Sequence, residues 1–145
     1  MKNDKDVREQ AEQLHRKVGT FILTCIGSDG YPMTKAVVPA KYRETLNELY
    51  FATNTSSKFV SEISKNNKAN VYFYSKRIAW KGCLLKGTME VVTDMKIKEK
   101  YWQEKFKGAY EQKSFADPDF CVIRFVPISG RFYANYTIAD FDIWE

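Results

Sequence analysis

The chain has 145 residues, of which 44% are hydrophobic and 15% are aromatic. This composition excludes a generally disordered chain, and the length suits one domain over residues 1–145 with a sizeable core. The formal net charge is +5, from 23 basic and 18 acidic residues that are spread along the chain. A basic tail for nucleic acid is therefore excluded, whereas a basic pocket for an anionic ligand stays open.

The three cysteines, Cys25, Cys83 and Cys121, lie far apart, each in an apolar stretch. We expect them to be buried thiols in a reducing compartment. The single histidine, His15, has no metal-ligand spacing to them, so no metal site is predicted, and we expect it on the surface of a helix. The N-terminal run MKNDKDVREQ lacks an apolar signal region, and no stretch approaches the ~20 apolar residues of a membrane helix. We expect a cytoplasmic protein without a membrane segment.

The first part of the chain predicts a helix followed by three strands. Four apolar residues recur at helical spacing, namely Val7, Ala11, Leu14 and Val18. They predict an amphipathic helix over residues 4–17, within the N-terminal segment 1–18. Strand-forming runs follow at 20–26, 34–40 and 49–53. The Asp-Gly pair in GSDGYP, between the first two strands, predicts a hairpin turn, and Pro39 moves the second strand toward an edge or a bulge.

The remaining predicted elements alternate in type. In chain order they are a helix at 57–65, strands at 69–75 and 80–93, a helix at 95–106, and strands at 120–127 and 129–136. The strand at 80–93 is long enough to bend, and Gly82 and Gly87 are the positions where we expect it to do so. Asp94 is a predicted N-cap for the helix at 95–106.

Six or seven antiparallel strands with a few helices predict a mainly β, α+β fold, built as a small barrel or sandwich. Aromatic residues occupy successive strand positions, among them Tyr72, Phe73, Tyr74, Phe132 and Tyr133. Because neighbouring residues of a strand face opposite sides, some of these rings must point away from the core. Either helices cover them or they form a dimer interface.

The strand-to-helix turn in FATNTSSKFVSEI, residues 51–63, is rich in hydroxyl side chains and ends on Lys58. The first N–H groups of a helix lack partners and carry partial positive charge. Ser56 or Ser57 can cap these groups or donate to a bound anion. Lys58 in the first turn is unfavourable unless an anion such as phosphate binds beside it. An ordinary capped helix is the alternative, and the sequence contains neither a P-loop nor a Rossmann glycine motif.

Three longer stretches extend this interpretation: DGYPMTKAVV, LYFATNTSSKFVSEISKNNKANVYFY and WKGCLLKGTMEVV. In this order they resemble the FMN-binding split-barrel superfamily, whose best-known member is pyridoxamine 5'-phosphate oxidase, and most closely its general stress protein branch. The likeness spans residues 10–133. It implies a six- to seven-stranded antiparallel split β-barrel that binds FMN in a cleft between the two chains of a homodimer.

The resemblance also implies how the phosphate of FMN is bound. The Ser-Arg-Lys motif of the oxidases falls on Ser57, Lys58 and Phe59, which keeps the serine and one cation but loses the other. The arginine on their second strand falls on Lys35, a weaker bidentate partner that still binds phosphate.

Further residues are implied beside the flavin itself. Thr53 matches a threonine that lies along the flavin, and Gly82 and Cys83 fall near the edge of the ring. No catalytic residue is assigned. The full set of predicted cofactor-binding residues is Lys35, Ala36, Val37, Phe51, Ala52, Thr53, Ser56, Ser57, Lys58, Gly82 and Cys83.

The function that the resemblance implies is that of an FMN flavoprotein, an oxidoreductase exchanging electrons with an unidentified small molecule, with a link to stress. The chain ends in NYTIADFDIWE, without the arginine segment that handles pyridoxine in the oxidases, so we do not expect it to oxidise pyridoxamine phosphate. The alternatives are a non-catalytic flavin-binding or storage module, and a relative that binds haem or a deazaflavin. A binder of single-stranded nucleic acid would explain NVYFYSKRIAWK, where basic and aromatic residues interleave, but cross-strand aromatics usually belong to a core or an interface.

Overall fold

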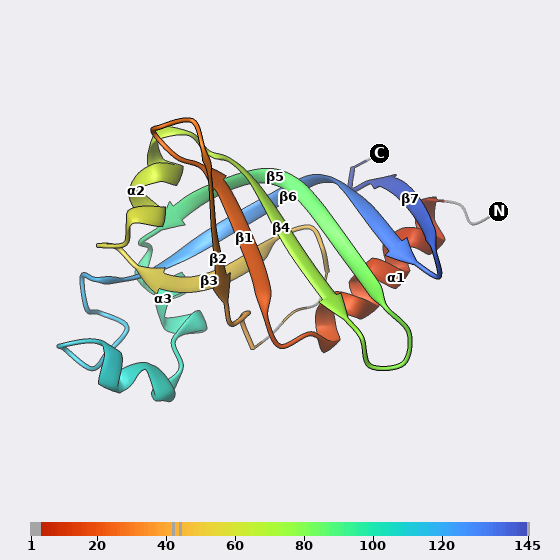
Figure 1. Cartoon of the computed structure of the whole chain (residues 1–145). Helices are drawn as coiled ribbons and strands as arrows, with labels where there is room; N and C mark the ends of the chain where they lie inside the picture. The colour runs from red at the N-terminus through yellow and green to blue at the C-terminus, as the bar shows by residue number, and fades with distance from the viewer. Residues whose placement is uncertain (1–3, 42, 44, 145) are drawn as a thin grey trace.

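The computed structural model describes residues 4–41, 43 and 45–144. Figure 1 shows the arrangement of the helices and strands formed by these residues. In chain order they are α1 (Asp4–Lys17), β1 (Phe21–Ile26), β2 (Pro32–Val37), β3 (Leu49–Asn54), α2 (Lys58–Lys65), β4 (Lys68–Ser75), β5 (Lys81–Val92), α3 (Met95–Tyr101), the short 3-10 helix η1 (Glu104–Ala109), β6 (Phe120–Ala134) and β7 (Thr137–Asp142). None of the described helices is both long enough and apolar enough to cross a membrane.

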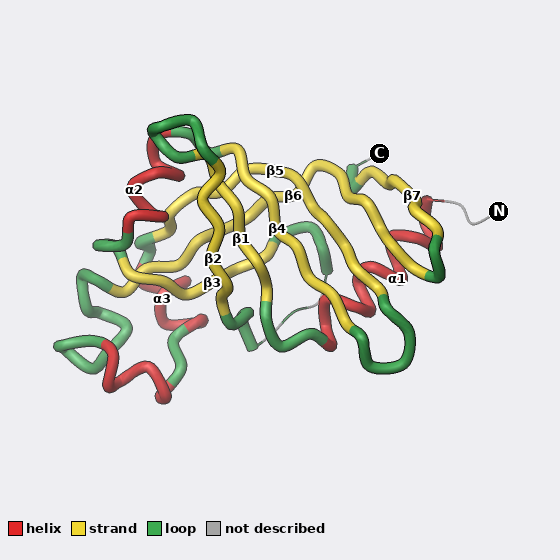
Figure 2. The backbone as a smooth tube through the Cα atoms, in the orientation of Figure 1, coloured by secondary structure: helices red, strands yellow, loops and turns green. Residues whose placement is uncertain are grey.

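The strands form one antiparallel sheet in the order β2-β1-β4-β5-β6-β3, and β7 pairs with the end of β6. The first and last strands of this order meet where the Lys35 ammonium donates to the Thr53 hydroxyl over 3.0 Å. We call this place the β2–β3 seam. The sheet therefore curls into a split barrel, as the ribbon and the tube show (Figures 1 and 2). The predicted mainly β, α+β fold of six to seven antiparallel strands is confirmed.

The interior of the barrel is apolar because alternate residues of each strand point inward. The Phe21 ring lies 5.6 Å from that of Phe51 and 4.9 Å from that of Phe73, so β1, β3 and β4 meet in one cluster. The apolar face of α1 is buried in the same core through the four residues of the predicted stripe, Val7, Ala11, Leu14 and Val18. Burial of each large side chain contributes ~1.5–3 kcal/mol, so this core is the main source of stability.

The β1–β2 hairpin and α2 lie together at one end of the barrel (Figure 1). Gly30 has a φ of 83°, and the Asp29 carboxylate accepts from the Tyr31 N–H, which confirms the hairpin predicted from Asp-Gly. α2 buries Phe59 and Ile63 in the barrel core. This packing brings the beginning of α2 close to the β2–β3 seam.

The last predicted strands, 120–127 and 129–136, are a single strand, β6. The prediction separated them at a proline, which lacks an N–H and usually interrupts a ladder. Pro127 lies opposite Gly87, where the register between β5 and β6 shifts. Lys86 faces Ser129 and Gly87 faces Pro127, so the extra residue of this bulge is Ile128 on β6, directly after the proline.

β7 was not predicted as a strand. The turn before it uses Asn135 and Tyr136, whose φ angles are 52° and 62°. Two-residue hairpin turns need positive φ at both positions and normally use Asn-Gly or Asp-Gly. With tyrosine at the second position, the usual turn signal is absent from the sequence.

The helix predicted at 95–106 is shorter than expected. α3 ends at Tyr101, and the chain continues through an extended Trp102 into η1. The Trp102 ring packs edge-on against Phe120 at 5.0 Å and Phe106 at 5.7 Å. This second aromatic cluster, outside the barrel, decides the break in the helix. β2 also ends earlier than predicted, at Val37.

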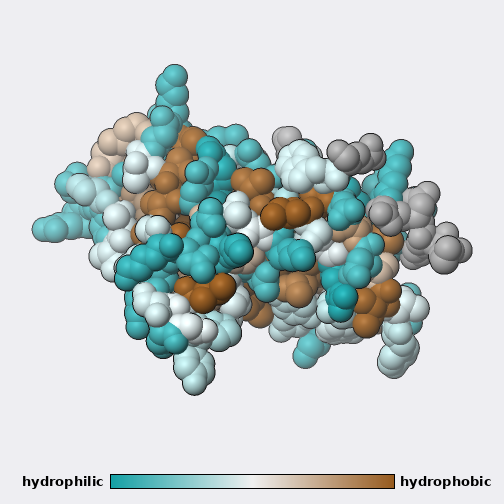
Figure 3. All heavy atoms as spheres, turned by 90° about the horizontal axis from the view of Figure 1, so that it is seen from above, coloured by the Kyte–Doolittle hydropathy of each residue, from teal (hydrophilic) through white to brown (hydrophobic). Residues whose placement is uncertain are grey.

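The aromatic residues of the strands divide between the two faces of the sheet. Phe73 and Phe132 are buried in the barrel, whereas Tyr72, Tyr74 and Tyr133 point outward and stay partly exposed. The buried residues of α1 and α2 belong to the inner core, so these helices do not cover the outward rings. Seen from above, the surface carries separate hydrophobic patches among hydrophilic side chains (Figure 3).

Candidate functional site

A half-buried lysine marks the β2–β3 seam. Besides its bond to Thr53, the Lys35 ammonium lies 5.0 Å from the centre of the Phe59 ring. Burial lowers the pKa of Lys35, and the nearby Cys121 and Cys25 oppose this shift. None of the ion pairs formed by the described residues includes Lys35. The seam therefore holds a cation that an anionic ligand can neutralise.

The turn beside this lysine is a capped helix start, which was the alternative interpretation of the serine-rich stretch. Ser57 is the N-cap of α2, and its hydroxyl accepts from the Val60 N–H over 3.2 Å. Lys58 is the first helical residue and is exposed. The cap uses one acceptor position of the Ser57 hydroxyl, which keeps its proton for another group.

An acidic residue already occupies part of the turn. The Asp119 carboxylate accepts from the Ser56 N–H over 2.8 Å and from the Asn54 side-chain amide over 3.0 Å. These two hydrogen bonds are the main reason that the pKa of Asp119 is lowered, so the group is charged at neutral pH. Sequence reasoning missed this contact because Asp119 lies 63 residues from Ser56 along the chain. An anion at this turn would meet a carboxylate as well as the lysines.

The loop that carries Asp119 is anchored behind the seam. The Tyr110 hydroxyl donates to the Thr53 carbonyl over 3.2 Å, and burial raises the pKa of Tyr110 to about 12. The buried Lys98 of α3 donates to the Asp117 carbonyl over 3.0 Å. These contacts hold β3 and the turn in place from the outer side.

The other predicted site residues do not all gather at the seam. Val37 points inward and packs against the barrel core, whereas Ala36 is exposed on the outer face beside Ile22. On β3, Phe51 is buried in the core and Ala52 packs against the outer aromatic cluster. Because successive residues of a strand point to opposite faces of the sheet, these adjacent residues have different neighbours.

Gly82 and Cys83 lie on β5, three strands from β2 in the sheet order. Cys83 is fully buried, and burial raises the pKa of its thiol. A Cβ on Gly82 would meet the Tyr72 hydroxyl and the Trp80 ring on the outer face. Within one chain, Gly82 and Cys83 therefore do not lie at the β2–β3 seam. All three cysteines are buried and free, as predicted.

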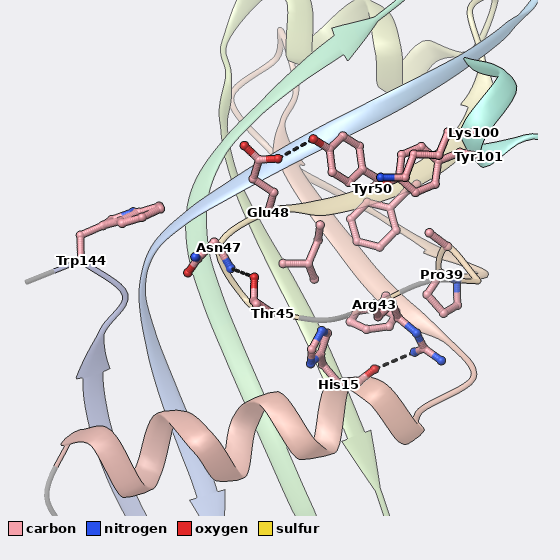
Figure 4. A pocket seen from close by; sticks show the side chains of 14 residues that line it. His15, Pro39, Arg43, Thr45, Asn47, Glu48, Tyr50, Lys100, Tyr101 and Trp144 are labelled. Atoms are coloured by element: carbon pink, nitrogen blue, oxygen red, sulfur yellow. Dashed lines mark hydrogen bonds between the residues drawn. The ribbon is translucent and has the colours of Figure 1, made fainter. Parts of the chain in front are cut away.

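A cavity of about 680 Å³ opens along the first half of β3 (Figure 4). It lies between the end of α1, the segment before β3, and α3, and Phe51 is the only predicted site residue that lines it. Much of its wall is aromatic, and the Tyr50 ring stacks on Tyr101 at 4.6 Å. A volume of this size is typical of small-molecule sites. Sequence reasoning missed the cavity because its walls come from four separate parts of the chain.

His15 lies at the bottom of this cavity, and its predicted surface position is wrong. It is only 1% exposed. Its spacing was a usable signal, because His15 lies four residues after Ala11 and therefore on the buried face of α1. The ring nitrogen Nδ1 contacts the Glu12 carbonyl, and burial lowers the pKa of His15 below its ordinary value. Among the described residues, no group of three or more His, Cys, Asp or Glu side chains is arranged to hold a metal ion.

The fold agrees with a known class of proteins. The family model described as pyridoxamine 5'-phosphate oxidase like matches residues 6–140. The chain therefore belongs to this family, as the resemblance indicated. None of the curated proteins matches the sequence.

Solved structures of the same fold include stress-related proteins. One is a protein of Clostridium acetobutylicum related to general stress protein 26 of Bacillus subtilis, with 27% identity and a TM-score of 0.82 over 98% of this chain and 97% of that one. General stress protein 26 of Bacillus anthracis has 18% identity and a TM-score of 0.74 over 92% and 97%. A haem-binding protein of Mycobacterium smegmatis has 11% identity and a TM-score of 0.74 over 94% of this chain and 57% of its own.

Proposed function

We propose that this protein binds FMN as a homodimer and exchanges electrons with a small-molecule partner. The observation that carries the proposal is the half-buried Lys35 ammonium at the β2–β3 seam, next to the beginning of α2. A phosphate there would offset the burial that lowers the pKa of Lys35. It would also meet the positive end of α2 and the ammonium of Lys58.

The residues at the seam fit the phosphate in part. Lys35 and Lys58 would bind it, and the Ser57 hydroxyl would donate to it while still capping α2. The Asp119 carboxylate opposes it, because it holds the Ser56 N–H that a phosphate would otherwise use. When bound, FMN supplies the redox chemistry itself. The chain then has to bind and orient the cofactor.

A homodimer is supported by the outer face of the sheet. Ile22, Tyr72 and Leu84 form one row across β1, β4 and β5, and each is partly exposed. Gly82 lies on the same face, beside the Tyr72 hydroxyl. Pairing of two chains through this face would bury the row. It would also explain how Gly82 could reach the flavin of the partner chain.

The phosphate assignment is tested by matched lysine variants. We expect freshly purified protein to show flavin absorption bands, or to gain them on reconstitution with FMN. Lys58→Glu should weaken FMN binding about tenfold, a loss of ~1.4 kcal/mol, measured by quenching of flavin fluorescence. Lys105→Glu is the control, because Lys105 is exposed on η1. Equal affinities of the two variants would contradict the assignment.

Two alternatives have their own tests. A non-catalytic flavin-binding or storage module would bind FMN but would not oxidise NAD(P)H with any of several acceptors. Haem binding is favoured by one of the similar structures, whose protein is described as binding haem. Titration with haem would distinguish it, because a bound haem changes its visible absorption.

A further inference from the structure

The cavity beside β3 contains a polar atom that the protein itself does not satisfy. The His15 Nε2 is buried and has no hydrogen-bond partner among the described residues. The other ring nitrogen is engaged by the Glu12 carbonyl, which can only accept, so Nδ1 carries the proton. The ring is neutral at physiological pH because its pKa is lowered by burial. Nε2 is therefore an acceptor that lacks a donor.

Several other polar groups around this cavity have hydrogen-bond partners within the protein. Arg43 donates to the carbonyls of His15 and Val18 at the end of α1, over 2.6 Å each. Glu48 accepts from the Tyr50 hydroxyl. In Figure 4 the His15 ring stands on α1 and points into the space below Thr45 and beside Arg43. Of the side chains that line the cavity, His15 thus offers a ligand a buried acceptor that has no partner among the described residues.

The walls specify the rest of the ligand. Phe21, Leu49 and Phe51 are buried apolar residues at the inner side, and the stacked Tyr50 and Tyr101 rings form another wall. Flat apolar walls of this kind favour a flat ring system. A buried acceptor without a donor is unfavourable. A ring that carries an N–H at its edge therefore gains more binding free energy in this cavity than a ring without one.

We propose that His15 positions a heteroaromatic ring in this cavity by accepting a hydrogen bond from a ring N–H, and that in the flavin this donor is the imide N–H, N3–H. The inference rests on the proposed function, since it assigns the ring end of the same cofactor. Phe51 lines the cavity, and Thr53, two residues further along β3, contacts Lys35 at the seam. Successive strand residues rise by about 3.3 Å, so Phe51 in the wall of the cavity and Thr53 at the seam lie about 7 Å apart on one strand. His15 is a positioning residue in this assignment.

The experiment compares two ring ligands that differ in the donor. Lumiflavin carries the N3–H and 3-methyllumiflavin lacks it. Their dissociation constants are measured by fluorescence quenching with wild type, His15→Phe, His15→Gln and the control Arg16→Gln, a neighbouring change on the more exposed side of α1. We expect wild type and Arg16→Gln to prefer lumiflavin about tenfold. His15→Phe should lose the preference, and His15→Gln, which retains an acceptor, should recover part of it.

The outcomes separate this inference from the proposed function. A wild type that binds FMN but does not distinguish the two lumiflavins overturns the role of His15 and leaves FMN binding intact. An unchanged preference in both His15 variants also overturns it. A haem absorption band that disappears in His15→Phe would show that Nε2 binds iron, and would overturn it too. Failure of wild type to bind any of these flavins, FMN included, overturns both proposals.

Discussion

Charged side chains at single positions decide what the turn before α2 can bind. Lys35 and Lys58 favour an anion there, while the Asp119 carboxylate is already bound to the Ser56 N–H and the Asn54 amide. Asp119 thus acts as an internal anion at the start of a helix, a place where negative charge is stabilised. A ligand phosphate has to bind beside this charge or displace it.

Removing the charge of Asp119 should strengthen FMN binding. Asp119→Asn keeps an acceptor for Ser56 but removes the like charge, and we expect the affinity for FMN to rise several-fold. Riboflavin, which lacks the phosphate, should bind with unchanged affinity. Asp142→Asn, an exposed change on β7, is the control. If Asp119→Asn changes the affinities for FMN and riboflavin equally, Asp119 affects the fold of the turn rather than the binding of the phosphate.

His15 should make the stability of the protein depend on pH. Burial is the main cause of its lowered pKa, Arg16 and Arg43 lower the pKa further, and Glu12 raises it. The unfolded chain therefore binds a proton more readily than the folded protein below about pH 6.5, and the free energy of unfolding falls as the pH drops through this range toward the folded pKa. Above it, His15 is neutral in both states and contributes no slope.

This dependence can be measured by urea unfolding between about pH 5 and pH 8. His15 is the only histidine in the chain, and the carboxyl groups titrate lower, so His15→Gln should remove most of the slope in this window. Identical slopes in the variant and in wild type would show that another group titrates there.

At the scale of the elements, the β-bulge between β5 and β6 decides how the longest strands pair. Gly87 lies opposite Pro127 at the register shift. A Cβ at this position would overlap the carbonyl oxygen of Val126 and approach Pro127 Cα to 2.7 Å, both of which are backbone atoms of β6. The strand pair therefore requires glycine here for close approach, although its φ is not in the left-handed region.

Gly87→Ala should accordingly destabilise the fold by ~3 kcal/mol or more, seen as a lower midpoint of urea unfolding. Gly108→Ala is the matched control, because nothing lies within 4 Å of a Cβ added there. We expect the control to be neutral or slightly stabilising, since alanine is the better helix former. Equal stability of the two variants would mean that β6 can move away from β5 at little cost.

At the scale of the whole molecule, the outer face of the sheet is the surface through which we propose that two chains pair. The helices bury their apolar residues in the barrel core and leave Ile22, Tyr72 and Leu84 without cover among the described elements. The proposed dimer buries this row.

Gel filtration should therefore give a mass near twice 16.9 kDa for wild type. Leu84→Glu places a charge at the β5 end of the row and should shift the protein toward the monomer, because an unpaired buried charge is strongly unfavourable. Met95→Glu, at an exposed apolar position on α3, should leave the dimer unchanged. A monomeric wild type that still binds flavin would contradict a site shared between chains.

Local patterns accounted for most of the elements. The stripe on α1, the Asp-Gly hairpin and the Ser57 cap each depend on residues within a few positions of one another, and each is found in the structure. The predictions failed where distant residues compensated for a local signal. Pro127 is tolerated because it lies at the β-bulge of β6, opposite Gly87, and β7 follows a turn without glycine.

The candidate site was only partly predictable. Lys35, Thr53 and Ser57 were named from their likeness to the family. In the structure Lys35 donates to Thr53 and lies over the ring of Phe59, two residues after Ser57. Asp119 and the cavity at His15 were missed, because each depends on segments more than 30 residues apart in the chain. No periodicity in one strand or helix reports such a contact.

By itself, the sequence determined the kinds of element, the mainly β fold and the run of polar residues before α2, since hydrophobic spacing and turn chemistry act over short distances. Only the tertiary structure decided which sides of the strands meet at the seam, that Asp119 occupies the turn, and that His15 lies unsatisfied under a cavity. These features follow from how the sheet curls, and that curvature is a property of all its strands together.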